Sequence, residues 1–547
     1  MKVDLIEAND RRVRDRWVLF GLGLFLTVLN AYKPLTVDDS VYYLFADHIS
    51  EHPLDPYGFR AWGVQEANTI LAPPVFLYWW ALELRVLGND PLLWKLGLLP
   101  FSLVLVFSLY TLGRRFVRGM ELLFVSFVVL SGAVLPCLNL MLDIPALALS
   151  LLAIVLLMRS CDRDSVAMAA VAGVIAGIAT QTKYTAFIAP VVMILYSFQT
   201  GKLRYGLLAS TLAGLLFVSW ELFIVGLYGE SHFWLACTQM NALTVPKYKL
   251  VPSLFGYLGS TLGAGLPLSL ASLGRSPRSI WVISSLVMLA FVSLVVPIHV
   301  TDDSWLVLLK PDPKYFGVFF GIVGFGFLTS LTTISIQLVR HHQALEGQPD
   351  GRWYNSVEGF LVLWLLLEIA GYIALSPYPA TRRLLGIVVV GILLICRLAT
   401  QTCGNRGVLW GTLAVNSLVG LLLFAVDFNW NYGPEMTARE IASECHECDP
   451  EKNIWYFGNS AFGFYGDRLG MKRVITPDTA VSSGDWVLVM HGFEPAFSQH
   501  PLSSRCIHQG LHEWNSILHV KSQYQAGNCA LQAEEKPLVM VNIYRVR

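Results

Sequence analysis

Long apolar runs recur along most of the chain, separated by short polar segments. A helix needs about 20 predominantly apolar residues to cross a membrane. The runs that approach this length are 17–32, 92–112, 120–138, 144–158, 166–180, 185–198, 205–228, 256–273, 280–297, 315–339, 357–375, 384–397 and 408–426. The pattern therefore predicts a mainly α, polytopic transmembrane protein with about thirteen spans.

One further apolar segment, 73–88, does not read as a span. It carries Glu83 and Arg85 and begins with a cluster of aromatic residues. Trp and Tyr favour the level of the lipid head groups, so we expect an interfacial helix within a first outer loop at 33–91.

Basic residues alternate along the chain in a way that predicts topology. With a cytoplasmic N-terminus, the inside loops hold Arg11, Arg12, Arg14, Arg16, Arg114, Arg115, Arg118, Arg159, Arg163, Lys202, Arg204, Arg275, Arg278, Arg340, Arg352 and Arg406. Cytoplasmic loops are enriched in Lys and Arg, and this alternation holds only if 73–88 does not span. An odd number of spans then places the C-terminus outside.

The tail differs in composition from the transmembrane region at 1–426. Short β-like runs begin at Asn453, Asp485 and Leu538, and a helix-like stretch covers 460–469. About 120 residues suffice for a small domain, so 427–547 is predicted to be an extracytoplasmic α/β domain. Its four cysteines favour structural disulfides, although Cys445 and Cys448 also have the spacing of a metal or redox motif; the full set is Cys445, Cys448, Cys506 and Cys529.

Composition supports the membrane assignment and excludes some functions. The chain is 54% hydrophobic and 14% charged, against about 25% charged residues in soluble domains. Its formal net charge is zero, so nothing favours binding to nucleic acid.

Two acidic sites border predicted spans on the outer side. Asp38 and Asp39 follow the first span, and Asp143 precedes the fourth. Carboxylates there could act as a general base or as ligands of a hydroxyl or metal. Ordinary helix capping explains them equally well, with Pro145 suited to the first turn after Asp143.

Two basic sites lie on the same side. Lys183 lies between two predicted spans that are joined by almost no loop. Arg382 and Arg383 are paired arginines on the outer side, where the enrichment of basic residues in cytoplasmic loops would disfavour them. Guanidinium groups suit phosphate or pyrophosphate. The alternatives are snorkelling of Lys183 and head-group anchoring by the arginines.

In their order, these features resemble the GT-C glycosyltransferases, specifically the group (glycosyltransferase family 39) with the protein O-mannosyltransferases and the lipid A aminoarabinose transferase. The acidic pair is followed by Tyr42 and Tyr43, then by Ala72-Pro73-Pro74 with Tyr78, by Asp143, and by Thr182-Lys183-Tyr184. The loop His232-Phe233-Trp234 and the segment Ala380-Thr381-Arg382-Arg383-Leu384-Leu385 continue the series. The chain departs from the group at Ala72, where relatives have His or Lys, and at Arg383, where Tyr is common.

The resemblance implies a GT-C fold and a reaction. A sugar would pass from a polyprenyl-phosphate lipid to a hydroxyl of a lipid, glycan or protein acceptor, with Asp38 as base and Asp39 and Asp143 orienting the acceptor. Lys183, Arg382 and Arg383 would bind the donor phosphate, and Tyr42, Tyr43, His232 and Trp234 would line the substrate loops. A divalent metal is a candidate cofactor, with Asp39 and Asp143 as its candidate ligands.

Two alternatives stay open at this point: a transporter or lipid flippase, and a catalytically inactive scaffold of the same fold. A transporter would not need the outer domain, and no matched broken helices indicate inverted repeats. The resemblance places the protein in a bacterial inner membrane, among membrane lipids, with its active site outside the cytoplasm.

Overall fold

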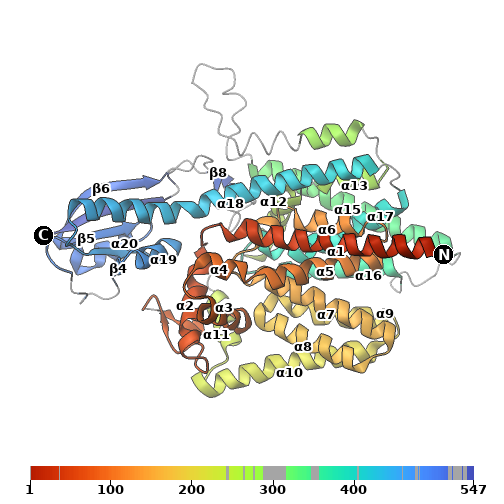
Figure 1. Cartoon of the computed structure of the whole chain (residues 1–547), viewed down its shortest axis with the longest axis horizontal. Coiled ribbons are helices and arrows are strands. Elements are labelled where there is room, and N and C mark those ends of the chain that lie inside the picture. Colours follow the sequence, from red (N-terminus) through yellow and green to blue (C-terminus); the bar gives the residue numbers. More distant parts are fainter. Residues whose placement is uncertain are drawn as a thin grey trace.

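The helices lie side by side in a bundle, with a small α/β domain at one end (Figure 1). The computed structural model describes residues 2–35, 37–63, 65–241, 246–262, 265–274, 278–286, 316–346, 356–402, 406–458, 460–474, 481–514 and 539–547, and in addition 479, 520–521, 532–533 and 537. The N-terminus lies at the end of the bundle opposite to the α/β domain, which holds the C-terminus (Figure 1). The architecture is therefore mainly α, as predicted, and a small α/β unit lies at its C-terminal end.

Seven described helices are long and apolar enough to cross a membrane. They are Pro91–Phe116 (α4 Pro91–Leu96 and α5 Leu99–Phe116), α7 (Asp143–Arg163), α10 (Leu203–Tyr228), Gly317–His342 within α15 (Phe316–Glu346), α16 (Val357–Leu375), α17 (Leu385–Thr402) and α18 (Arg406–Cys448). A bent pair, α12 (Lys247–Leu262) with α13 (Leu266–Ser272), raises the number to eight. The membrane class is confirmed, whereas the number of thirteen spans stays a prediction.

The remaining predicted spans have different outcomes. The run 17–32 lies in α1 (Lys2–Ala31), and two runs form the shorter helices α8 (Val166–Thr182) and Tyr184–Gln199, which contains η3 (Tyr184–Phe187) and α9 (Ile188–Gln199). The run 280–297 lies largely outside the described residues.

The prediction of one continuous span at 120–138 is wrong. Helix α6 (Glu121–Val129) is followed by buried turns and by η2 (Leu135–Cys137). Irregular backbone at membrane depth needs partners from the protein. Here Asn30 donates to the carbonyl of Leu135 at 2.8 Å, and the ammonium of Lys33 donates to that of Pro136 at 2.6 Å.

The first outer loop contains α2 (Val37–Glu51), the hairpin β1–β2 (Arg60–Ala61 and Gln65–Glu66), η1 (Ala67–Thr69) and α3 (Pro74–Leu87). Helix α3 has 14 residues and so is about 21 Å long, which is shorter than the hydrocarbon core. It packs mainly on α2, in agreement with an interfacial position.

The α/β domain contains a five-stranded sheet in the order β4-β3-β5-β9-β6. Strand β3 (Ile454–Phe457) is parallel to β4 (Lys472–Arg473) and β5 (Trp486–Met490), whereas β9 (Val539–Val546) is antiparallel to β5 and β6 (Cys506–Trp514). The three predicted strands are β3, β5 and β9, and the predicted helix is α19 (Ser460–Arg468). Strand β6 and the short helix α20 (Glu494–Gln499) were not predicted.

Helix α18 joins the two parts without a break, so the predicted boundary at 426/427 falls inside a helix. The domain cysteines also differ from expectation. Cys445, Cys448 and Cys506 carry free thiols, and Cys529 lies outside the described residues. No disulfide therefore joins any two of these three thiols.

Candidate functional site

Four segments that are distant in sequence bring charged side chains together at the end of the bundle near the α/β domain. They are the first turn of α2 with Asp38, the first turn of α7 with Asp143, Lys183 at the end of α8, and Arg382 in η8 (Thr381–Arg383). The sequence predicts all four on one side of the membrane, and the structure places them in one cluster.

The first ion pair of the cluster joins α2 to η8. A guanidinium nitrogen of Arg382 donates to Oδ2 of Asp38 at 2.7 Å, although the two residues are 344 positions apart. The side chain of Arg382 is 7% exposed, whereas that of Asp38 is 35% exposed. Arg382 is thus fixed within the protein, and the carboxylate of Asp38 can still be approached from outside.

The second ion pair joins α7 to the end of α8. The ammonium of Lys183 donates to Oδ1 of Asp143, whose side chain is 3% exposed. Burial lowers the pKa of Lys183, while Asp143 opposes this shift and Arg383 and Arg382 add to it. The two ion pairs therefore influence each other and form one electrostatic unit.

Two tyrosines complete the cluster. Arg382 donates to the hydroxyl of Tyr378 at 2.6 Å, and the guanidinium of Arg383 lies 4.6 Å from the centre of the same ring. Burial alone would raise the pKa of Tyr378, but the two arginines outweigh it and lower that pKa. Tyr42 is partly buried beside Asp38, and both burial and the charge of Asp38 raise its pKa, so it stays a neutral phenol.

Arg382 itself is held in its charged form. Burial would lower its pKa, but Asp38, Tyr378 and Asp143 outweigh burial and raise the pKa well above its ordinary value. A guanidinium of this kind keeps its charge when a ligand excludes water from the site.

A groove leads from these cations into the bundle between α7, α9, α16 and α17. Its polar end is lined by Lys183, Arg382 and Arg383, and its walls are mainly apolar, including Leu151 and Val389. Nε of Arg383 is buried and has no hydrogen-bond partner among the described residues. The groove thus combines a guanidinium that has one unsatisfied nitrogen with an apolar channel, which suits an amphiphile with an anionic group.

Asp39 does not belong to this cluster. It is fully buried and acts on Lys95, whose ammonium donates to the carbonyl of Pro34 at 3.0 Å. Neighbouring residues on a helix point about 100° apart, so Asp38 and Asp39 face different surroundings. The surroundings of Asp39 include the buried ion pair of Lys33 and Asp427 at 2.7 Å, which joins the segment after α1 to α18.

Tyr43 also faces away from the cluster. Its ring stacks on Trp94 with centroids 5.4 Å apart and meets Phe464 of α19 edge-on at 5.1 Å. This residue therefore contributes to the contact between the outer loop and the α/β domain.

His232 lies at the start of α11 (His232–Asn241) and is buried. Its Nε2 lies 2.9 Å from the carbonyl of Ile70 and must donate, so Nδ1 accepts from the hydroxyl of Tyr184 at 2.8 Å. Burial lowers the pKa of His232 to about 4. It is therefore a neutral positioning group between the Lys183 segment and the outer loop, whereas Trp234 is 70% exposed.

The residues considered as metal ligands are separated by their partners. Asp143 is bonded to Lys183, and Asp39 faces Lys95. Among the residues that the structure describes, no group of three His, Cys, Asp or Glu side chains could hold a metal ion. The described residues therefore do not form the group of metal ligands that a divalent cation would need.

Two residues near the site were not predicted from the sequence. Tyr378 stands between two prolines four residues before Arg382, and an aromatic residue so close to paired arginines was the available signal. Lys247 donates to the carbonyls of Ala374 (3.1 Å) and Ser376 (2.9 Å). No local pattern marks Lys247, because its partners are more than 120 residues away.

No family model and no curated protein sequence matches the chain. Among solved structures, it is similar to ArnT from Cupriavidus metallidurans bound to undecaprenyl phosphate (13% identity, 97% of each chain covered, TM-score 0.44). It is also similar to the archaeal oligosaccharyltransferase AglB from Archaeoglobus fulgidus in complex with an inhibitory peptide and a dolichol-phosphate (11% identity, 88% of this chain and 69% of that chain covered, TM-score 0.46).

Proposed function

We propose that this protein is an integral membrane glycosyltransferase that moves a sugar from a polyprenyl-phosphate donor to an acceptor hydroxyl at the extracytoplasmic face. The observation that carries the proposal is the convergence of Lys183, Arg382 and Arg383 at the polar end of an apolar groove, with Asp38 bonded to Arg382 beside it. The motif series described above also contains these residues in the order found in GT-C enzymes.

The donor would bind with its lipid chain along the groove and its phosphate among the three cations. Phosphate accepts charge-assisted hydrogen bonds from arginine forks, and the buried Nε of Arg383 is available for one. An incoming phosphate competes with Asp38 for Arg382. Donor binding would thereby release the carboxylate that is needed for the next step.

Asp38 would then accept the proton of an acceptor hydroxyl, whose oxygen attacks the anomeric carbon of the sugar. The bond between that carbon and the phosphate oxygen breaks, and the polyprenyl phosphate leaves with the electron pair. Lys183, Arg382 and Arg383 stabilise the charge that develops on the leaving phosphate. A single displacement of this kind inverts the configuration at the anomeric carbon.

The same proposal includes an orientation in the membrane. Helix α7 runs from Asp143 at the site to Arg163 and is about 30 Å long, the thickness of the hydrocarbon core. Arginines gather at its far end, and the positive-inside bias makes that end cytoplasmic. The site and the α/β domain would then lie outside, in a bacterial inner membrane.

Mass spectrometry of lipid and cell-surface glycan extracts tests the function. Cells with Asp38→Asn should lose one glycan modification and accumulate its polyprenyl-phosphate sugar, whereas cells with Asp47→Asn, an exposed position of the same helix, should match the wild type. Equal profiles for all three, under conditions where the protein is needed, would exclude Asp38 as the base and favour transport or a scaffold.

A further inference from the structure

A second charged pocket lies at the end of the bundle opposite to the site. It encloses about 730 Å³ between α1, α5, α7 and the turn that joins α5 to α6. Five arginines line it: Arg16, Arg114, Arg115, Arg118 and Arg159. Only two carboxylates, those of Glu121 and Asp162, belong to the same lining, so the pocket carries a net positive charge.

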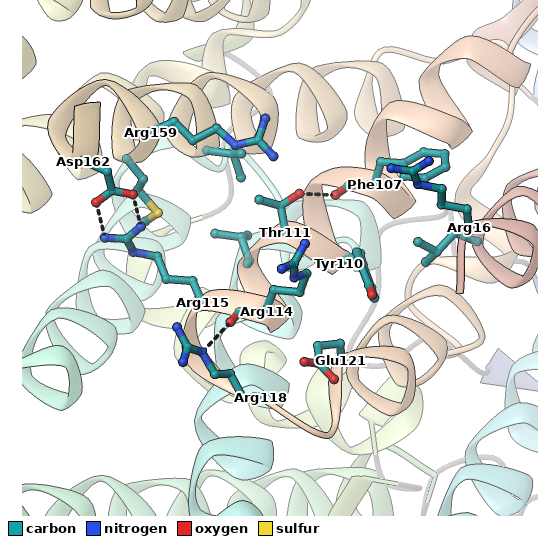
Figure 2. Close-up of a pocket in the computed structure, with 14 residues that line it drawn as sticks. Arg16, Phe107, Tyr110, Thr111, Arg114, Arg115, Arg118, Glu121, Arg159 and Asp162 are labelled. Carbon is teal, nitrogen blue, oxygen red and sulfur yellow. Dashed lines mark hydrogen bonds and ion pairs between the residues drawn. The ribbon is translucent and has the colours of Figure 1, made fainter. Parts of the chain in front are cut away.

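Most of the arginine charge has no acidic partner. Arg115 forms a bidentate ion pair with Asp162, with distances of 2.7 and 2.9 Å. Arg16, Arg114 and Arg159 have no carboxylate partner among the described side chains, and Figure 2 shows the guanidinium groups of Arg114 and Arg159 within the pocket. Like charges repel, so guanidinium groups that converge without carboxylates favour the binding of an anion.

The floor of this pocket is apolar. Leu19, Phe107 and Val155 contribute to it, and Phe107 is also exposed on the flank of the bundle. Trp17, next to Arg16, is exposed on the flank, and tryptophan favours the boundary between lipid and water. The pocket therefore combines cations with an apolar part of its lining.

This pocket lies far from the candidate donor site. Helix α7 separates Asp143 from Arg159 by about 24 Å, so no phosphate at one end can reach the cations at the other. The positive-inside bias explains arginines at this end of the helices. It does not explain why they line one concave pocket with an apolar floor.

We propose that this pocket binds the phosphate head group of an anionic phospholipid from the leaflet on the N-terminal side. Arg114 and Arg159 contact the phosphate oxygens, and Arg16 supplies a third charge at the rim. Asp162 fixes Arg115 at the edge, and the first part of an acyl chain lies along the apolar floor. Basic pockets between membrane helices recognise anionic head groups by the same chemistry.

The test uses the full-length protein in nanodiscs that contain equal amounts of phosphatidylglycerol and phosphatidylcholine. After extraction into detergent, native mass spectrometry counts the lipids that remain bound. The wild type should retain phosphatidylglycerol selectively, and Arg114→Gln/Arg159→Gln should reduce this retention about tenfold. The matched control is Arg14→Gln/Arg163→Gln, which removes two charges from the same end outside the pocket and should retain the lipid within about twofold of the wild type.

Equal losses in the two double variants, or no loss in either, would contradict the proposal. Displacement of the lipid by inorganic phosphate would also overturn it, because the pocket would then take a soluble anion. If the glutamine variant does not fold, Arg114→Lys/Arg159→Lys keeps the charge and removes the forked donors. Phosphatidylglycerol retention should still fall in that variant, and full retention would contradict the assignment of the two arginines.

Discussion

Asp143 and Lys183 depend on each other at the centre of the candidate site. The carboxylate is almost completely buried, and Lys183 supplies its charged partner. Removing one member of a buried ion pair leaves an uncompensated charge, which costs about 3–5 kcal/mol, whereas replacing both by apolar residues is often neutral. The pair is therefore a case where stability and activity can be separated.

Lys183→Met is expected to lower the thermal unfolding midpoint strongly, because Asp143 is left buried and charged. Lys183→Met/Asp143→Leu should recover most of that stability; under the proposed function it should still transfer no sugar, since the donor phosphate would lose a cation. Thermal unfolding and donor turnover of the single and double variants measure the two effects. Additive losses of stability would show that the pair is not coupled.

Glu83 of α3 gives the stability of the protein a pH dependence. Its side chain is buried and accepts a hydrogen bond from the indole of Trp79 at 2.6 Å, and burial raises its pKa from 4.5 to about 8. The folded state therefore holds a proton that the unfolded chain releases near pH 4.5. The contribution of Glu83 to folding stability therefore falls as the pH rises from about 4.5 to about 8, and it levels off above pH 8.

The thermal unfolding midpoint of the wild type should thus be lower at pH 8.5 than at pH 6, by the equivalent of about 1–3 kcal/mol. Glu83→Gln should remove most of this difference. Glu51→Gln changes an exposed carboxylate in the neighbouring helix and should leave the pH dependence intact. A pH dependence that persists in Glu83→Gln would assign it to another group.

At the scale of single residues, the sequence predicts where a charged residue lies along the chain better than it predicts the direction in which its side chain points. Asp38 and Arg382 could be placed on one side of the membrane because span boundaries and charge bias fix that side. The different surroundings of Asp38 and Asp39 could not be predicted before it was known that both residues lie on the helix α2. The contact of Tyr378 with Arg382 and Arg383 depends on the turn between α16 and η8, whose conformation a hydrophobicity pattern does not predict.

Close contact between helices α12 and α15 depends on glycine. A Cβ on Gly259 would lie 1.9 Å from the carbonyl oxygen of Phe320, and one on Gly324 would lie 1.9 Å from that of Phe255. Small residues let membrane helices approach until their backbones touch. This pair makes more contacts than any other pair of described elements, so the glycines set the position of the bent segment α12–α13.

Gly259→Val is expected to lower stability by about 2 kcal/mol or more, since backbone atoms must move apart. Gly321→Ala, on the face of α15 where a Cβ would meet nothing within 4 Å, should be neutral or slightly stabilising. Thermal unfolding of the two variants in the same detergent compares them. Equal effects would mean that α12 and α15 do not pack through their glycines.

Hydrophobicity predicts most of the long helices but fails where apolar residues are buried in protein. The run 120–138 is apolar enough to span, yet its second half forms turns that are stabilised by Asn30 of α1 and by Lys33, just beyond that helix. Such partners are distant in sequence, so no local window can detect them. In the α/β domain, short β-like runs predict β3, β5 and β9, but β6 is mostly polar and exposed.

Helix α19 attaches the α/β domain to the outer loop. Phe464 contacts the rings of Tyr43 and Trp94, Tyr465 accepts a hydrogen bond from the backbone of Leu35 at 3.0 Å, and Arg468 donates to Asn89 at 2.9 Å. Helix α2, which carries Asp38, also packs on α19. The domain therefore supports the helix that holds the proposed base.

Phe464→Ala should loosen α2 and raise the hydrogen exchange of residues 37–51. Phe497→Ala is the matched control: Phe497 is equally buried but packs on Phe457 and Tyr544 within the domain. Both substitutions should destabilise the domain by about 3–5 kcal/mol, and only the first should increase exchange in α2. Increased exchange of α2 in both variants would show that the domain acts through its overall stability.

Helix α18 has 43 residues and extends about 65 Å as one rod from the bundle to the sheet. The rotational position of the domain around the axis of α18 is consequently set by the number of residues in the helix. One inserted residue beyond Asp427 would rotate the domain by about 100° and carry Arg468 away from Asn89, whereas seven would restore its azimuth to within about 20° but raise it by about 10 Å. An insertion or deletion in this stretch would therefore be tolerated best when its length is close to a whole number of helical turns.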